Sequence, residues 1–164
     1  MRKYIILFIT VSIIGCTAPK NTVDYKKISQ KEFLETPFGF DENIENFTNL
    51  EKPRFKTQKL LRKNKHYPEK TDTIYQLTYK KSEIFFYKTY LGKEFLLAGK
   101  VLNKEIHLKN SIQVGMYKDQ FIDRFSDELK FKADSLQLIG EGTRYTFIFT
   151  KNKLSRINID NYFD

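Results

Sequence analysis

The chain is poor in histidine and cysteine, the side chains that most often bind transition metals. Its two histidines, His66 and His107, are 41 residues apart, without cysteines or an acidic cluster at metal-ligand spacing. Neither histidine lies in a recognisable catalytic motif, so a Ser/His/Asp triad cannot be assigned from the sequence. The motif Gly-x-Ser-x-Gly is also absent. His107 alternates with Ile106 and Leu108, which favours a solvated strand position. The sequence predicts no enzyme activity, no catalytic residue, no metal site and no cofactor.

Two further patterns look like sites but have simpler explanations. Asp119, Asp123 and Asp127 recur every four residues, which places them along one face of a predicted helix. Carboxylates equally spaced along one helix face do not converge on a single calcium ion, so we expect these aspartates to form the exposed face of the helix. The segment Gly140-Glu141-Gly142 precedes an aromatic strand and lacks the third glycine and the following helix of a phosphate loop, which favours a hairpin turn.

The best lead for binding is a basic run between Lys52 and Lys70. Eight lysines and arginines stand in it against one acid, Glu69, with Phe55, Leu60, Leu61 and Tyr67 interleaved. One interpretation is a solvated loop or exposed helix. The other is a surface for an anionic partner, because a one-sign patch with apolar residues inside it attracts negative charge. The residues predicted to bind such a partner are Arg54, Lys56, Lys59, Arg62, Lys63 and Lys65.

The single cysteine, Cys16, follows a short apolar run at the start of the chain. Arg2 and Lys3 precede this run, which extends from Tyr4 to Ile14. It is shorter than the roughly 20 residues of a spanning helix, and its charge and length match a secretory signal. The segment Ile13-Ile14-Gly15-Cys16 resembles a bacterial lipoprotein signal. This resemblance implies cleavage before Cys16 and lipids on its thiol and new amino group.

The lipoprotein signal divides the chain into three parts. We expect a signal peptide over residues 1–15, a lipidated flexible tether over 16–27 and a single α+β domain over 28–164. Loss of Arg2 and Lys3 lowers the formal charge from +9 to +7. Residues 17–20 contain no acid, whereas the surface-export tag of known lipoproteins resembles an acidic cluster there. An outer-membrane protein facing the periplasm is therefore favoured, which disfavours nucleic acid as a partner.

The domain is expected to hold a curved antiparallel sheet with helices packed on one face. Ser29 and Glu32 form a candidate capping box before a first helix, and apolar spacing predicts helices over 41–47 and 118–129. The second of these would bury Phe121, Ile122, Phe125 and Leu129. Alternating residues and tight links predict antiparallel hairpins, with strands over Asp72 to Tyr79, Ser82 to Thr89, Phe95 to Leu102, Ser135 to Ile139, Arg144 to Thr150 and Lys153 to Ile159.

These elements suggest two tandem helix-plus-strands repeats, residues 28–108 and 109–164. The segment 112–116 and the later segment 145–154 resemble a family of small lipoprotein domains. It is typified by the E component of the outer-membrane β-barrel assembly machine and by the tandem-repeat inhibitor proteins of β-lactamase. The match covers roughly 50 residues, Ile112 to Ile159. This resemblance implies the fold of that family and a role in binding a partner, but it assigns no functional residue.

Two functional hypotheses follow. The first is a non-catalytic accessory protein, anchored to the membrane through Cys16, that docks on an outer-membrane or periplasmic assembly through a sheet edge or the basic run. The second is an inhibitor or immunity protein that blocks an exported enzyme or toxin. The expected partners are the membrane, a protein of the envelope, and an anionic lipid or cell-wall polymer.

Overall fold

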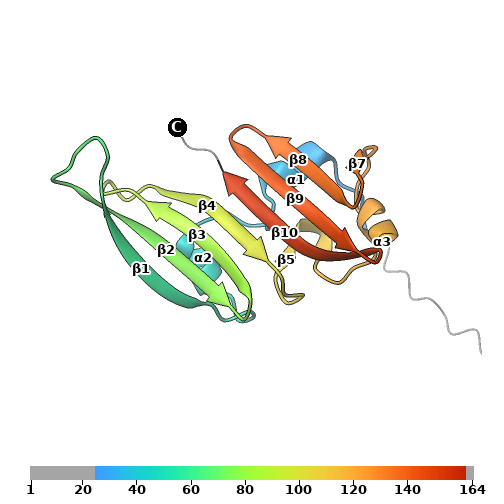
Figure 1. Cartoon of the computed structure of the whole chain (residues 1–164), viewed down its shortest axis with the longest axis horizontal. Helices are drawn as coiled ribbons and strands as arrows, with labels where there is room; N and C mark the ends of the chain where they lie inside the picture. Colours follow the sequence, from blue (N-terminus) through green and yellow to red (C-terminus); the bar gives the residue numbers. More distant parts are fainter. Residues whose placement is uncertain (1–24, 162–164) are drawn as a thin grey trace, which may run out of the picture.

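The computed structural model describes residues 25–161, which fold around one large antiparallel sheet (Figure 1). Its eight strands lie in the order β1-β2-β3-β4-β10-β9-β8-β7, and β5 and β6 form a separate small sheet. The strands are β1 (Lys56–Lys63), β2 (Thr71–Tyr79), β3 (Ser82–Lys88), β4 (Glu94–Val101), β5 (His107–Leu108), β6 (Ile112–Gln113), β7 (Phe131–Lys132), β8 (Ser135–Gly140), β9 (Thr143–Thr150) and β10 (Lys153–Asn161). The helices of this part are α1 (Gln30–Glu35), α2 (Ile44–Thr48), α3 (Lys118–Ile122) and the 3-10 turn η1 (Lys109–Ser111).

The antiparallel sheet predicted from the sequence is confirmed. All six predicted strands are present, with bounds within two residues of those expected. The tight links Lys80-Lys81 and Lys151-Asn152 close hairpins, and Lys151 and Asn152 have φ values of 50° and 61°. Such left-handed pairs match the twist of two-residue hairpin turns. The fold is mostly sheet, and its helices are few and short.

The sheet consists of two four-stranded meanders that meet at a central pair. β4 and β10 lie side by side, and consecutive strands follow outwards from each, to β1 on one side and β7 on the other (Figure 1). We call β1–β4 the first meander and β7–β10 the second meander. The two outer strands were not predicted from the sequence. The interpretation of residues 28–108 and 109–164 as tandem repeats stays a prediction.

One face of the sheet carries the core across both meanders. The register places Leu77, Ile84, Gly99, Ile159 and Tyr145 in one row across five neighbouring strands. Residues directly opposite each other share a face, and the four side chains of this row are buried. A Cβ on Gly99 would lie 2.9 Å from Cδ1 of Ile159, so the glycine leaves the space that this isoleucine fills.

Aromatic rings of the helices pack on that core face. Phe33 of α1 has its ring centroid 5.4 Å from that of Tyr145 and 5.8 Å from that of Phe147, both in β9. Phe47 of α2 lies 5.2 Å from Phe86 of β3. α1 therefore packs on the second meander although it precedes the first in sequence, and α2 packs on the first (Figure 1). The second meander is therefore covered in part by a helix from the other sequence half.

The predicted first two helices are present, with differences at their boundaries. The Ser29 hydroxyl accepts a hydrogen bond from the Glu32 amide at 3.0 Å, which is the N-cap half of the predicted capping box. α2 begins at Ile44 instead of residue 41, because Asn43 caps it by accepting a bond from the Asn46 amide at 2.8 Å.

The third helix is much shorter than predicted. α3 ends at Ile122, whereas apolar spacing extended it to residue 129. The reason is a tertiary contact: the Ile28 amide donates to the carbonyl of Arg124 at 3.0 Å and its carbonyl accepts from Ser126 at 2.9 Å. These bonds hold the chain around Phe125 extended. Phe121 and Phe125 are buried as expected, but Ile122 is exposed, so its predicted burial is wrong.

Candidate functional site

The predicted basic run forms one outer edge of the sheet. Residues 56–63 are β1, which pairs with β2 in an unbroken antiparallel register from Lys56 to Lys63. Residues 56–63 are therefore a strand and not part of an exposed helix. The rest of the run lies in loops, and all eight residues of β1 are exposed, as the solvated interpretation predicts. Arg54 precedes the strand and Lys65 follows it.

The pleat of β1 distributes its cations over both faces of the sheet. Lys56 and Arg62 occupy even positions, which point away from the core face. Lys59 and Lys63 occupy odd positions and point to the core side, where Lys59 Nζ lies 5.3 Å from the ring centroid of Tyr75. The predicted anion-binding residues are thus brought together along one edge, in two rows instead of one patch.

These cations form no salt bridge within the described residues, although Arg62 acts electrostatically on Asp72, which lies opposite it in β2. The four salt bridges found within residues 25–161 involve none of the six predicted residues. Two leucines interrupt the cations at the middle of the strand, with Leu60 44% and Leu61 76% exposed. Because Leu60 and Leu61 point to opposite faces, each face of the edge presents one apolar side chain between basic ones.

A buried carboxylate organises the loops at the end of this edge. Asp72 accepts hydrogen bonds from the Tyr87 hydroxyl, from Asn64 Nδ2 at 2.7 Å and from the Tyr90 amide at 2.8 Å. The bond from Tyr87, with smaller contributions from the others and from Arg62, holds the pKa of Asp72 below its usual value. Asp72 thereby connects the β1–β2 loop with the β3–β4 turn. We call this group the Asp72 hub.

The Asp72 hub presents exposed apolar side chains beside the end of β1. Tyr67 and Tyr90 lie with ring centroids 5.9 Å apart, and Leu91 is exposed next to Tyr90. Lys70 Nζ lies 6.0 Å from the Tyr90 ring. The exposed surface at this end of the molecule is therefore basic and aromatic.

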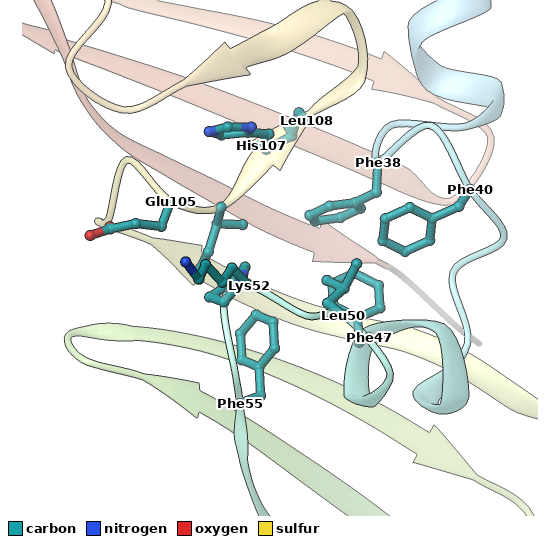
Figure 2. Close-up of a pocket in the computed structure, with 11 residues that line it drawn as sticks. Phe38, Phe40, Phe47, Leu50, Lys52, Phe55, Glu105, His107 and Leu108 are labelled. Carbon is teal, nitrogen blue, oxygen red and sulfur yellow. The ribbon is translucent and has the colours of Figure 1, made fainter.

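A small aromatic pocket of about 230 Å³ lies beside α2 (Figure 2). The rings of Phe38, Phe40 and Phe47 lie together on one side of it, with centroid separations of 4.8 to 6.0 Å. Glu105 turns its carboxylate away from the rings, towards its salt-bridge partner Lys80. Sites for drug-sized ligands begin near 300 Å³, so this pocket suits one apolar side chain better than a cofactor.

The structure places the two histidines on separate segments. His66 belongs to the β1–β2 loop, where its amide donates to Asn64 Oδ1 at 2.9 Å, and His107 is exposed in β5, as predicted. Within residues 25–161, no group of three His, Cys, Asp or Glu side chains is placed to hold a metal ion. Cys16, the predicted lipidation site, lies outside the described residues.

Of the two other patterns, the glycine segment is the expected hairpin turn, whereas the three aspartates are exposed as expected but do not share one helix. Asp119, Asp123 and Asp127 are exposed, but only Asp119 lies within α3 because the helix ends early. Asp127 Oδ2 accepts a hydrogen bond from the Gln30 amide at 2.6 Å, at the start of α1. Gly140 ends β8 and Gly142 precedes β9 with φ of 69°, so this segment is a hairpin turn.

Sequence reasoning missed one titratable pair, which joins the loop between α1 and α2 to β9 of the second meander. Glu42, between α1 and α2, accepts a hydrogen bond from the buried Tyr145 hydroxyl at 3.1 Å. Burial raises the pKa of Glu42 from 4.5 to about 7, against a smaller lowering by the Tyr145 bond. Burial also raises the pKa of Tyr145 well above its usual value. The partners are 103 residues apart, so no local pattern signals the pair.

The described residues contain no helix of the length and apolar character needed to cross a bilayer. Comparison with known proteins finds no family model that matches the chain, and no match among curated proteins or solved structures.

Proposed function

We propose that this chain is a lipid-anchored protein of the bacterial envelope that binds a protein partner and catalyses no reaction. The observation that carries the docking role is β1, an eight-residue edge strand with all residues exposed and with cations that take part in none of the salt bridges of residues 25–161. A long exposed edge is a template for another chain, and proteins that lack a partner for such an edge usually shorten or cover it. The anchor is Cys16, carried by its resemblance to lipoprotein signals.

In this proposal the helices and loops form one layer on the core face, giving the α+β arrangement expected from the sequence. Support for the layer comes from Phe33, Phe47 and Phe121, whose rings contact core-face residues of β3 and β9. The layer gives the sheet a stable backing. The edge at β1 is then free to exchange partners without opening the core.

The location we propose is the outer membrane, on its periplasmic side. It rests on the signal sequence and on the lack of acids in residues 17–20. An N-terminal lipid gives stable anchoring when more than one acyl chain is attached. The folded domain would then work at the membrane surface, within reach of assemblies in the same membrane.

Replacement of the lipidated residue tests the anchor. The Cys16→Ser variant is expected to leave the membrane pellet after a carbonate wash, while the wild-type protein stays in it. Ser12→Ala, a matched change within the signal, is expected to leave the wild-type distribution unchanged. A Cys16→Ser protein that remains in the washed membranes contradicts the lipid anchor.

Purification from the native envelope tests the docking role. After cross-linking and extraction in mild detergent, a stoichiometric membrane complex is the expected companion. A soluble exported enzyme or toxin in its place would instead support the inhibitor or immunity function, which the resemblance to β-lactamase inhibitors allows. Recovery of the protein with lipid alone contradicts both protein-binding functions.

A further inference from the structure

We infer that β1 takes up an acidic, extended segment of its protein partner as a ninth strand of the sheet. This inference rests on the proposed docking function and specifies the partner's chemistry. Backbone groups of alternate β1 residues point away from β2, its neighbour in the sheet order. An added strand would use them for main-chain hydrogen bonds, which supply affinity in strand addition.

The two edges of the sheet are not equivalent as templates. β1 offers eight residues, whereas β7 at the other edge offers two, Phe131 and Lys132. A two-residue strand offers an added segment only one or two hydrogen bonds. These are too few to offset the conformational entropy that the segment loses when it becomes ordered. Phe131 is moreover half-buried against Phe149, with ring centroids 5.6 Å apart. Strand addition is therefore expected at β1 alone.

The charges of β1 select an acidic segment. Its four cations lie on both faces of the edge, and β1 contains no acid. Opposite charges that face each other across neighbouring strands stabilise the pair, and like charges destabilise it. An incoming strand with carboxylates on both faces would meet a cation on each, and the central pair Leu60 and Leu61 would face two apolar side chains.

The same charges disfavour a second copy of this chain. In a two-fold antiparallel β1–β1 pair centred on Lys59, the two Lys59 side chains would face each other and Lys56 of each copy would face Arg62 of the other. The eight cations of the two strands would then line one seam with no acid between them. A homodimer through this edge is therefore unfavourable, and a different, acidic chain is the occupant that fits.

The position of β1 favours a protein over the chain's own bilayer. The described chain starts at Tyr25, whose ring lies 3.2 Å from the Arg124 guanidinium carbon, on the side of the second meander. β1 lies at the opposite end of the strand order, seven strand spacings from β7, or roughly 30 Å at about 4.8 Å each. The edge is thus remote from the point where the lipid-bearing segment joins the domain.

A designed peptide probes the edge directly. The fluorescently labelled peptide Glu-Glu-Val-Ile-Glu-Thr-Thr-Glu, aligned antiparallel to β1, places its glutamates opposite Lys63, Arg62, Lys59 and Lys56 and its two apolar residues opposite Leu61 and Leu60. Binding to the full-length protein in mild detergent is measured by anisotropy. Residue-level amide exchange is measured on the same complex, because strand addition protects outward-facing β1 amides and diffuse charge attraction does not.

Matched variants locate the binding. The triple change Lys59→Glu, Arg62→Glu, Lys63→Glu is expected to weaken the peptide at least tenfold. The control Lys130→Glu, Lys132→Glu, Lys151→Glu changes the net charge equally at exposed positions of the second meander and is expected to leave affinity within twofold. The same peptide with lysine for each glutamate is expected not to bind. Circular dichroism confirms that both triple variants fold.

The outcomes separate this inference from the proposed function. Peptide binding with protected β1 amides, lost in the β1 triple variant only, supports the strand addition. Binding without such protection, or equal loss in the two triple variants, overturns it. If an envelope partner copurifies with the wild-type protein and still copurifies with the β1 triple variant, the inference fails while the docking function stands. If neither peptide nor partner binds, both fail.

Discussion

The two meanders of one sheet end in different ways. In the second meander, Phe33, Phe121 and Phe125 form a continuous aromatic cluster over β9, and the outer strand is reduced to two residues. The first meander has Phe47 over β3, extends to a fully exposed edge, and is held at its far end by the Asp72 hub. Both meanders have an aromatic backing, because Phe38, Phe40 and Phe55 pack around Phe47. The difference between them therefore lies at their outer strands, one of which is reduced to two residues while the other is a long open edge.

The largest effect is expected from the aromatic cluster. Phe147→Ala should lower the free energy of unfolding by about 3 to 5 kcal/mol, because the ring is fully buried and contacts Phe33 and Phe121. Thr146→Ala changes the adjacent residue, which points to the other face, and should cost below about 1 kcal/mol. Urea unfolding measures both. A loss below 1 kcal/mol for Phe147→Ala would break the assignment of this ring to the core of the second meander.

The contact between the α1–α2 loop and the second meander should show in the pH dependence of stability. Because the folded state raises the pKa of Glu42 to about 7, stability from this group is fully present below about pH 4.5 and is lost as pH rises through 7. Glu42→Gln removes the ionisation and should stabilise the protein at pH 8 by up to about 3 kcal/mol, with little gain at pH 4. Thermal unfolding at both pH values measures this, with the exposed Glu35→Gln as control. An equal effect at the two pH values contradicts a buried carboxyl.

We expect the Asp72 hub to stabilise only the loops that it connects. Asp72→Asn removes the carboxylate that accepts three hydrogen bonds, so amides of residues 64–70 and of Tyr90 should exchange faster while those of β9 keep their protection. Because the pKa of Asp72 is lowered, its contribution is present above its ordinary value and disappears as pH falls. Wild type and variant should therefore converge in acid. Asp134→Asn, in the β7–β8 turn, is the matched control; a spread of fast exchange into β9 would show that the meanders do not differ.

The smallest effect is expected at the open edge. Leu61→Thr keeps a β-forming residue at a position that is 76% exposed, so the free energy of unfolding should change by less than about 0.5 kcal/mol. Leu138→Ala, in buried β8, should cost about 2 to 5 kcal/mol in the same urea experiment. A cost above 1 kcal/mol for Leu61→Thr would mean that the edge is packed and not open.

The strands that the sequence predicted well are those that bury one face against the core. The strands β2–β4 and β8–β10 bury one face, so their apolar residues alternate and their bounds were predicted closely. β1 buries neither face, so period two is absent from it. Pro53 before it and the turn residues Asn64 and Pro68 after it were the signals that could have bounded it.

Other features were not predictable from local patterns because distant residues determine them. α3 ends early through the bonds between Ile28 and the chain around Phe125, and the Glu42–Tyr145 pair joins segments about a hundred residues apart. The basic residues of the candidate site were identified from composition. Their arrangement in two rows required the strand assignment. The lipid anchor at Cys16 lies outside the described residues and stays a prediction.

The last strand of the chain occupies the middle of the sheet, and this affects how the protein reaches its native state. β10 pairs with β4 on one side and β9 on the other, so the strands of the two meanders are joined within the sheet only when β10 is in place. Contacts of such long sequence separation form late and slowly. Truncation of the chain before β10 would therefore remove the strand that joins the two meanders within the sheet, and would leave only contacts such as those of Phe33 and Glu42 with Tyr145 to hold the parts together.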